Sequence, residues 1–377
     1  MDDHDHAAAI NLAHSGQIGT FVEMDDESNA PTLKDIADAA GVSVASVSKV
    51  LNNRGGVGDE SRRKILDHAE RLGYQVRAAR SLIRAGVEST VLVMPAQFYA
   101  SSAFYEDVIQ GVLAEASTSS LRIDVRLVSL DAEIAISEIS DILRDIRPGA
   151  LVVLGMDHPV MIDRIVDSGI PAVIINGMDR TMRLSCVLPD NWSAGWLAAQ
   201  RLLAAGHREI VHVTIPHRLS LRRRLEGFRI ALEEAGIAFD ENRHIFDLGR
   251  MGLQEPDTTP AIRQAIKQGR FTDTTAFFCS TDLIAINVMQ ALEASSHSVP
   301  EDFSIIGVDD IAIARHSRPP LTTMRIDRGE LGRAGIQLLL ERINDPEINV
   351  RRVNLGVRLV ERSTVAVPRS SPHAKRA

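Results

Sequence analysis

The sequence contains few cysteines, few aromatic residues and no long apolar run, and each shortage argues against a class of protein. Only Cys186 and Cys279 are cysteines, so a disulfide framework is not expected and both are predicted as reduced thiols of a cytoplasmic protein. No apolar run approaches the roughly 18 residues of a membrane span. Aromatic residues make up 4% of the 377 residues, so the hydrophobic cores must consist mainly of aliphatic side chains.

Positive charge is missing from the start of the chain. Residues 1–30 hold no lysine or arginine and seven acidic residues, which does not fit the basic start of a secretory signal. They show no hydrophobic period and are predicted to be a disordered leader. Residues 31–86 hold ten basic and six acidic residues, a net +4 within a chain of net −8. This distribution suits a nucleic-acid contact that is limited to one small domain.

Residues 31–75 are predicted to form three short helices. Thr32 can cap the first helix, which ends at Gly41, and Ser43 can cap the second. The third is expected from about Ser61 to Leu72. The side chains predicted to face inward are Leu33, Ile36, Ala37 and Ala40 on the first helix, Val47, Val50 and Leu51 on the second, and Ile65, Leu66, Ala69 and Leu72 on the third.

The helix, tight turn and second helix have the spacing of a helix-turn-helix. The second helix leaves one face free: Val44, Ala45, Ser48 and Lys49. Val44 and Ala45 suit a thymine methyl group, and Lys49 suits the acceptor atoms of guanine. The hydroxyl groups that suit DNA phosphates are those of Thr32, Ser43 and Ser46. A three-helix packing module that binds no DNA has the same spacing, so that alternative stays open.

From residue 88 to residue 368, short aliphatic runs alternate with amphipathic stretches, which indicates parallel sheets covered on both faces by helices. About four such units precede Pro189 and four follow it. We therefore expect two doubly wound lobes, at about 88–188 and 189–319, with 320–368 crossing back between them and 369–377 as a tail. The predicted strands are Val91–Met94, Ile123–Val128, Leu151–Leu154, Val173–Ile175, Ile210–Ile215, Ile245–Leu248, Ala276–Cys279 and Ser304–Val308. Ligands of such folds bind outside the carboxyl ends of the strands.

The segment from Thr32 to Asn52 resembles the N-terminal signature of the lactose-repressor-type (LacI/GalR) regulators. Further matches follow in the family's order over most of the chain: Arg71-Leu-Gly-Tyr74, Arg224-Leu-Glu-Gly-Phe228, Thr281-Asp282, Val299–Asp310 and Pro319–Thr323. The resemblance implies an all-α helix-turn-helix domain and a two-lobed α/β body similar to periplasmic sugar-binding proteins, joined by a hinge at residues 76–87.

For the DNA-binding part, the resemblance implies that Val44, Ala45 and Lys49 read bases and that Leu82 wedges into the minor groove of the operator. Asn52, at the end of the motif, and Arg80, in the hinge, are also predicted to contact DNA. A linker or packing role for Leu82 and a solvated Arg80 are the alternatives. Val76 and Arg77 stand where family members usually carry a Pro-Asn pair, so the hinge departs from the pattern.

For the body, the resemblance implies that Arg224 and its partner carboxylate Asp282 bind a polar effector. A solvated position in the Arg222–Arg224 run and a helix cap are the respective alternatives. Phe104 and Tyr105 match an aromatic pair that stacks on the ligand in some relatives, with lobe packing as the alternative. Asn176 stands where many relatives carry an aspartate, which changes the hydrogen bonds available to an effector.

No catalytic motif and no metal-ligand spacing is evident, so we predict neither an enzyme nor a cofactor. The predicted function is that of a sequence-specific transcriptional regulator, a repressor. It is expected to bind a near-palindromic double-stranded operator as a homodimer or higher oligomer, with no membrane partner. A small polar effector, a sugar or related metabolite, would set its operator affinity. The alternative is a solute-binding or sugar-processing protein on the same α/β fold.

Overall fold

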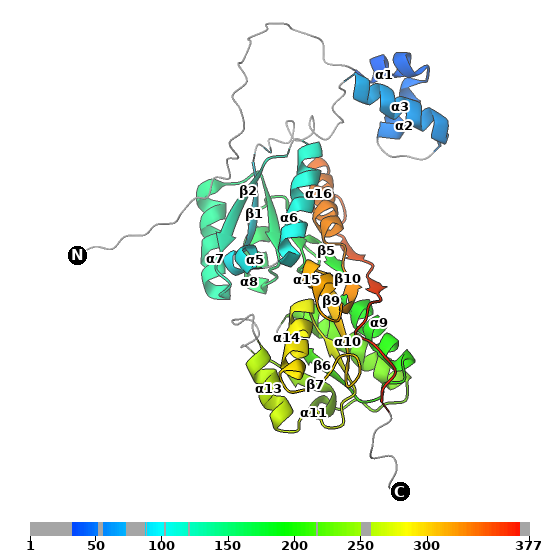
Figure 1. The fold of residues 1–377 in the computed structure, drawn as a ribbon. Coiled ribbons are helices and arrows are strands. Elements are labelled where there is room, and N and C mark those ends of the chain that lie inside the picture. The colour runs from blue at the N-terminus through cyan, green and yellow to red at the C-terminus, as the bar shows by residue number, and fades with distance from the viewer. Residues whose placement is uncertain are drawn as a thin grey trace, which may run out of the picture. The chain divides into compact units, whose positions relative to one another are not determined.

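The computed structural model describes residues 32–51, 56–72, 87, 89–101, 103–119, 121–215, 218–249 and 258–369. The chain separates into two compact units, Met1–Gln75 and Val76–Ala377 (Figure 1), and each is described by itself. The predicted leader, the predicted hinge apart from Val87, and the predicted DNA contacts Asn52, Arg80 and Leu82 lie outside the described residues.

The first unit contains three helices in its described part: α1 (Leu33–Ala40), α2 (Val44–Leu51) and α3 (Asp59–Arg71). The predicted cap of α1 is confirmed, because the Thr32 hydroxyl accepts the Asp35 N–H at 3.3 Å while the Asp35 carboxylate accepts the Thr32 N–H at 2.6 Å. The chain leaves α1 at Gly41 with a φ of 65°, a conformation that glycine adopts without steric cost.

The core of this unit is small, and one part of its prediction is wrong. The side chains buried in it are Ile36, Ala37, Val47, Val50, Ile65 and Ala69. Leu66 and Leu72, both expected inside, are 46% and 40% exposed. Within the described part of this unit α3 packs on α1 and α2, so its buried stripe is narrow and takes Ile65 and Ala69, one turn apart.

The second unit consists of two lobes, each built on a six-stranded sheet. The first sheet is parallel throughout, in the order β11 (Arg352–Leu355), β5 (Ser185–Pro189), β4 (Ala172–Ile175), β3 (Ala150–Leu154), β1 (Thr90–Pro95) and β2 (Ile123–Val128). The second runs β12 (Arg358–Val360), β10 (Thr322–Arg325), β9 (Ser304–Asp309), β8 (Ala276–Cys279), β6 (Ile210–Thr214) and β7 (Ile245–Asp247). Among the described strands, only β12 is antiparallel to its neighbour. The predicted α/β fold class with two doubly wound lobes is confirmed.

Helices cover both faces of each sheet (Figure 1). In the first lobe, α6 (Ala103–Thr118) and α16 (Arg328–Asn344) cover one face, and α7 (Ala132–Asp141) and α8 (Pro159–Asp167) cover the other. In the second lobe, α9 (Asn191–Ala204) and α10 (Leu219–Glu234) lie opposite α13 (Thr259–Lys267) and α14 (Asp282–Glu293). Burial on both faces explains the near-continuous aliphatic runs of the central strands. The described part of the body also contains three short α-helices, α5 (Ala96–Ser101), α11 (Glu241–His244) and α15 (Ala312–His316), and a π-helix, η1 (Ile142–Ile146).

The chain passes between the lobes three times. It crosses from β5 into α9, from β10 into α16, and from β11 into β12. As a result, the first lobe contains a helix and a strand, α16 and β11, that come from the C-terminal part of the chain. Changes in the angle between the lobes must therefore occur at these three crossings.

Two glycines allow the close contact of α9 with α10. A Cβ atom at Gly195 would overlap the carbonyl oxygen of Arg224, and one at Gly227 would overlap that of Trp192. The backbones of the two helices therefore touch, which fixes the position of the first turns of α10 on the second lobe.

We predict that Gly227→Ala destabilises the second unit by about 1–3 kcal/mol, because the added methyl group must push two backbones apart. Gly356→Ala is the matched control, since a Cβ there meets no atom within 4 Å. Urea unfolding of both variants and of the wild type tests this. Equal midpoints for the two variants would contradict the close contact.

Candidate functional site: a DNA-reading helix and an interlobe cleft

The exposed face of α2 carries the side chains predicted to read DNA. Val44 is 44% exposed, Ala45 and Lys49 are exposed as well, and Val47 and Val50 are buried on the opposite face. The Ser43 hydroxyl accepts the Ser46 N–H at 3.1 Å, which confirms the predicted cap of the helix. The structure thus brings the predicted base-reading residues onto one surface of a capped helix, with Val44 and Ala45 in its first turn and Lys49 in its last turn.

The remaining predicted DNA contacts of this unit differ in how far their hydroxyl groups are already engaged within the protein. Ser43 and Ser46 have hydroxyl oxygens 2.9 Å apart at the start of α2. The Thr32 hydroxyl donates to the Asp35 carboxylate at 2.7 Å and is therefore committed to the cap of α1. Ser48 is partly buried. Phosphate contact by these side chains stays a prediction.

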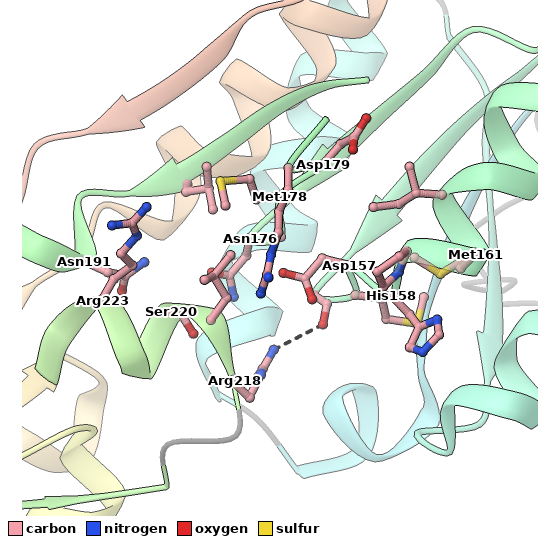
Figure 2. Close-up of a pocket in the computed structure, with 18 of the residues that line it drawn as sticks. Asp157, His158, Met161, Asn176, Met178, Asp179, Asn191, Arg218, Ser220 and Arg223 are labelled. Atoms are coloured by element: carbon pink, nitrogen blue, oxygen red, sulfur yellow. Dashed lines mark hydrogen bonds between the residues drawn. The ribbon is translucent and has the colours of Figure 1, made fainter. Parts of the chain in front are cut away.

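A cavity of about 1000 Å³ lies between the two lobes of the body (Figure 2). The first lobe lines it with the segments that follow β3 and β4, from Gly155 to Asp163 and from Asn176 to Arg183. The second lobe lines it with the first turn of α10 and the residue before it, Arg218. The cavity therefore lies at the carboxyl ends of parallel strands, where such folds bind ligands.

Arg218 extends from the second lobe to the first across this cleft. Its Nη2 donates to the Tyr105 hydroxyl and to the Gly155 carbonyl, each at 3.1 Å, and its guanidinium lies 4.8 Å from the Phe98 ring centre. Asn176 Nδ2 donates to the same Tyr105 hydroxyl at 2.9 Å. Arg218 forms no ion pair with any carboxylate of the described residues. This guanidinium is therefore held by neutral oxygen atoms and an aromatic face.

Asp157 is a carboxylate of the cavity wall whose charge interacts with that of Arg218. Burial raises the pKa of Asp157, and the charge of Arg218 opposes that rise. It forms no ion pair within the described residues, and it lines the cavity with Asn176 (Figure 2). A partly desolvated carboxylate beside a primary amide is suited to hydrogen-bonding ligand hydroxyl groups.

Arg224, the predicted effector-binding arginine, lies one layer behind the cavity wall. It is only 4% exposed, which excludes the alternative of a solvated side chain. Its Nε donates to Asn191 Oδ1 at 2.9 Å, its Nη1 donates to the Ser280 carbonyl, and its Nη2 lies 3.6 Å from Asp309. Asn191 lines the cavity, so Arg224 reaches the cavity through that side chain.

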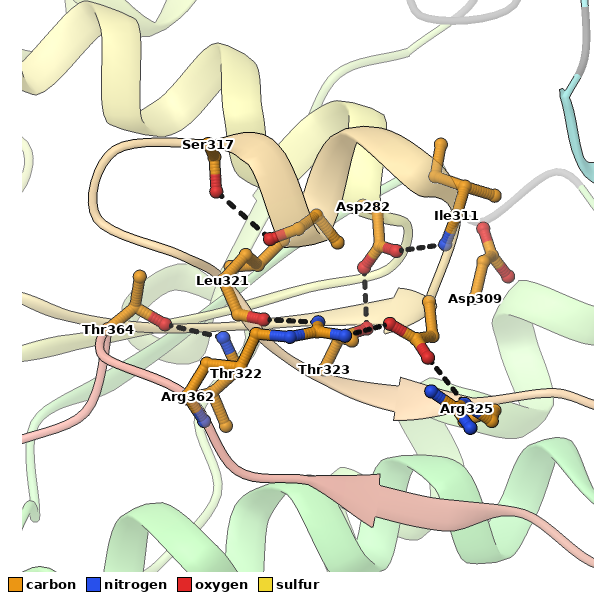
Figure 3. Close-up of polar contacts among 12 residues, drawn as sticks. Asp282, Asp309, Ile311, Ser317, Leu321, Thr322, Thr323, Arg325, Arg362 and Thr364 are labelled. Carbon is orange, nitrogen blue, oxygen red and sulfur yellow. Dashed lines mark hydrogen bonds and ion pairs between the residues drawn. The ribbon is translucent and has the colours of Figure 1, made fainter.

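Asp282 is fully buried within the second lobe and does not line the cavity. Figure 3 shows it between Thr323 and Ile311. Its two oxygens accept the Thr323 hydroxyl at 2.5 Å and the Ile311 N–H at 2.9 Å. Burial, with the neighbouring charge of Asp309, raises its pKa well above the usual range. The alternative of a helix cap is wrong, because Thr281 is the residue that caps α14.

The predicted aromatic pair lies behind the cleft. Tyr105 is buried and contacts the cavity wall through its hydrogen bonds to Asn176 and Arg218 and by stacking on the Phe98 ring, with ring centres 4.9 Å apart. Phe104 packs edge-on against Tyr105, with ring centres 5.1 Å apart, and against the core of the lobe. Of the five predicted effector residues, Asn176 alone lines the cavity.

Asp157, Arg218 and Arg222 line the cavity but were not predicted. A usable signal exists for Asp157, because it follows the predicted strand ending at Leu154 by three residues, and strand ends are where ligands bind in such folds. Arg218 and Arg222 gave no such signal, since basic residues at the start of a helix are ordinarily solvated.

The crossings between the lobes are held by a second set of arginines. Arg325 and Arg362 both pair with the Asp310 carboxylate (Figure 3). Arg328, at the start of α16, donates to the Asp309 carbonyl and pairs with Asp107 at 2.7 Å. Asp309 and Asp310 therefore belong to the structure of the crossings.

Within the described ranges, no helix has both the length and the apolar character to cross a membrane. No group of three or more potential metal-ligating side chains occurs in that part of the chain either.

Each of the two units is similar to known proteins. Residues 32–76 match the model of bacterial regulatory proteins of the lacI family, and residues 199–365 match a periplasmic binding protein-like domain. The ribose operon repressor of Haemophilus influenzae is 30% identical over 341 residues, which cover 89% of this chain and 98% of that protein. The transcriptional repressor PurR of Vibrio parahaemolyticus is 28% identical with the same coverage. A solved complex of the regulator CelR with cellobiose has a TM-score of 0.65 and 26% identity, over 89% of this chain and 99% of that one.

A helix-turn-helix unit followed by two parallel-sheet lobes around a cleft defines a DNA-binding transcriptional regulator with an effector-binding body. The chain belongs to the lacI family of bacterial regulatory proteins, which confirms the resemblance seen in its sequence.

The buried Asp309 predicts a pH dependence of stability. Burial raises its pKa to about 6, against the opposing charge of Arg224. The folded state therefore binds a proton more tightly than the unfolded state does, and this contribution to stability is present at low pH and lost as pH rises through about 6.

We expect the free energy of unfolding of the wild type, relative to Asp309→Asn, to fall by on the order of 2 kcal/mol between pH 4.5 and pH 7. Asparagine cannot ionise, so the variant does not show this fall in the free energy of unfolding. Urea unfolding of both proteins across this range measures the difference. Parallel curves would show that Asp309 ionises normally in the folded protein.

Proposed function

We propose that this chain is a cytoplasmic repressor that binds a near-palindromic operator as a homodimer and changes its affinity when a small polar effector enters the interlobe cleft. It has no catalytic role in this proposal. The observation that carries it is the cavity at the carboxyl ends of β3 and β4, which Arg218 crosses to join the two lobes. Any ligand there must contact both lobes and change the contacts between them.

The DNA side of the proposal rests on the surface of α2. Val44 and Ala45 offer small apolar contacts to a thymine methyl, and Lys49 offers donors to guanine O6 and N7. The start of the helix, at Ser43, adds N–H groups and hydroxyls for phosphate. A homodimer presents two such helices to successive half-sites, which is why the operator is expected to be near-palindromic.

The effector side rests on the cavity wall. Asp157, Asn176 and Asn191 supply acceptors and donors for hydroxyl groups, and Arg218 supplies a charged donor. The relative named for the ribose operon and the one solved with cellobiose support a hydroxylated effector. An effector that binds one lobe arrangement better than the other shifts the population of that arrangement.

Arg224 and Asp282 have positioning roles in this proposal. Arg224 holds the Asn191 side chain at the cavity and ties it to Ser280 and Asp309 of the second lobe. Asp282 ties the start of α14 to β10 and to the segment after β9. Together with Tyr105, which orients Asn176, they would set effector choice through the residues that line the cavity.

We predict that Lys49→Ala lowers the ratio of specific to non-specific DNA binding about 10- to 100-fold, because one base contact is worth roughly 1–3 kcal/mol. Lys64→Ala is the control, since Lys64 lies on α3 and pairs with Glu60. Selection of binding sites from random DNA, followed by gel-shift titration, measures the ratio. Full preference in Lys49→Ala would refute the reading face, and a wild type without any sequence preference would refute the regulator itself.

We predict that Asn176→Ala reduces the rise in melting temperature that effectors produce in the wild type, because it removes a lining amide and loosens Tyr105. Asn344→Ala, at the exposed end of α16, is the matched control. A thermal-shift screen of sugars, sugar acids, sugar phosphates and nucleobases supplies the measurement. An undiminished shift in Asn176→Ala would place effector binding elsewhere.

A further inference from the structure

We infer that the effector of this cleft is an anion: a small hydroxylated molecule whose carboxylate or phosphate is bound by Arg180, Arg218 and Arg222. The inference rests on the proposed function, because it names the chemical class of the ligand of the same site. It is carried by the charges that the cavity wall leaves without a partner.

The wall of the cavity is rich in arginine. Six arginines and four aspartates line it: Arg180, Arg183, Arg218, Arg222, Arg223 and Arg352, with Asp157, Asp163, Asp179 and Asp190. The wall therefore has an excess of two positive charges. Part of this set is already satisfied, because Arg183 pairs with Asp163 at 2.8 Å and Arg223 pairs with Glu226 at 2.8 Å.

Two of the aspartates are occupied by the backbone of their own segments. The Asp179 carboxylate accepts N–H groups of Arg183 and Leu184, and the Asp190 carboxylate accepts the Ser193 N–H at the start of α9. Asp157 is then the one lining carboxylate with no ion pair and no side-chain partner among the described residues.

Three lining arginines remain without a carboxylate at ion-pair distance in the described part of the chain: Arg180, Arg218 and Arg222. Arg218 bonds only to neutral oxygens, those of Tyr105 and Gly155. A fourth, Arg352, donates Nη2 to the Asp179 carbonyl, while its buried Nε has no hydrogen-bond partner. Arg218 and Arg352 are partly buried, and guanidinium groups partly removed from water are stabilised by a counter-charge, which a ligand can supply here.

Two helix starts add to the positive potential of the cavity. The start of α10 lies at Arg218, and the start of α8 lies at His158, and both residues line the cavity. Neither start has a side-chain cap or an acidic residue in its first turn. The partial positive charge of both helix termini is therefore free to act on a ligand.

The same wall indicates that the ligand carries hydroxyl groups and only a limited negative charge. Asp157 lies among the three unpaired arginines and would repel a second anionic group placed beside it. Asp157 and Asn176 instead suit hydroxyl groups. A sugar acid and a sugar monophosphate both have this combination of one anionic end and several hydroxyls.

The test uses inorganic phosphate as the probe and the full-length protein. We expect 10 mM phosphate, at constant ionic strength, to raise the melting temperature of the wild type by about 3 °C in a saturable way. The double variant Arg180→Gln/Arg222→Gln should lose this saturable rise and keep only the general salting effect of phosphate. Both side chains are exposed, so the variant is expected to fold.

The matched control is Arg229→Gln/Arg263→Gln, which removes the same charge from exposed positions outside the cavity. It should respond to phosphate as the wild type does. Equal phosphate responses in all three proteins would overturn the inference, and so would a saturable rise in the cavity variant.

Calorimetry with glucose, gluconate and glucose 6-phosphate separates the two sources of the anion. Binding of gluconate without glucose identifies a carboxylate, and binding of glucose 6-phosphate alone identifies a phosphate. Glucose binding that Asn176→Ala removes and Arg180→Gln/Arg222→Gln leaves intact would overturn the anion while leaving the cleft as the effector site. Binding that neither variant changes would contradict the proposed function as well.

Discussion

The contact of Arg218 with Tyr105 and Gly155 is the interaction on which the proposed switch depends. It connects the lobes across the cavity without a carboxylate, so its strength is that of hydrogen bonds to neutral groups and of a guanidinium over the Phe98 ring. Such a contact is modest enough for a ligand to replace. A ligand that bonds to Arg218 therefore competes for the group that holds the lobes together.

The surrounding structure fixes the position of the backbone that carries Arg218. The glycine contact between α9 and α10 fixes the helix that Arg218 precedes, and Arg224, on the same helix, is anchored to Ser280 and Asn191. The crossings between the lobes are tied by charged pairs at Asp310 and Arg328. The body thus combines two lobes tied by these contacts with a cleft whose hydrogen bonds to neutral groups a ligand can replace, an arrangement suited to the proposed two-state sensor.

Periodicity and capping rules were sufficient to predict most of the fold. The central strands are continuous aliphatic runs because both faces of each sheet are buried, and the caps at Thr32 and Ser43 are local features. The strands β5, β10, β11 and β12 were not predicted because polar residues interrupt or flank their few aliphatic residues. The exposed face of α2 could be predicted from the apolar residues on its opposite face, Val47 and Val50, which are buried. Arg218 and Arg224 look alike in the sequence, because each is a basic residue near the start of a helix. Tertiary packing decides that Arg218 lines the cavity and that Arg224 is buried behind it.

The most direct test of the lobe contact is a distance measurement between the lobes. Spin labels at Asp167→Cys on α8 and Arg263→Cys on α13 report on it by double electron–electron resonance, and the native Cys186 and Cys279 are buried and would stay unlabelled. We expect one narrow distance distribution in the ligand-free protein and a broader or shifted one when Arg218→Ala is added. An unchanged distribution would contradict the claim that Arg218 holds the lobes in their arrangement.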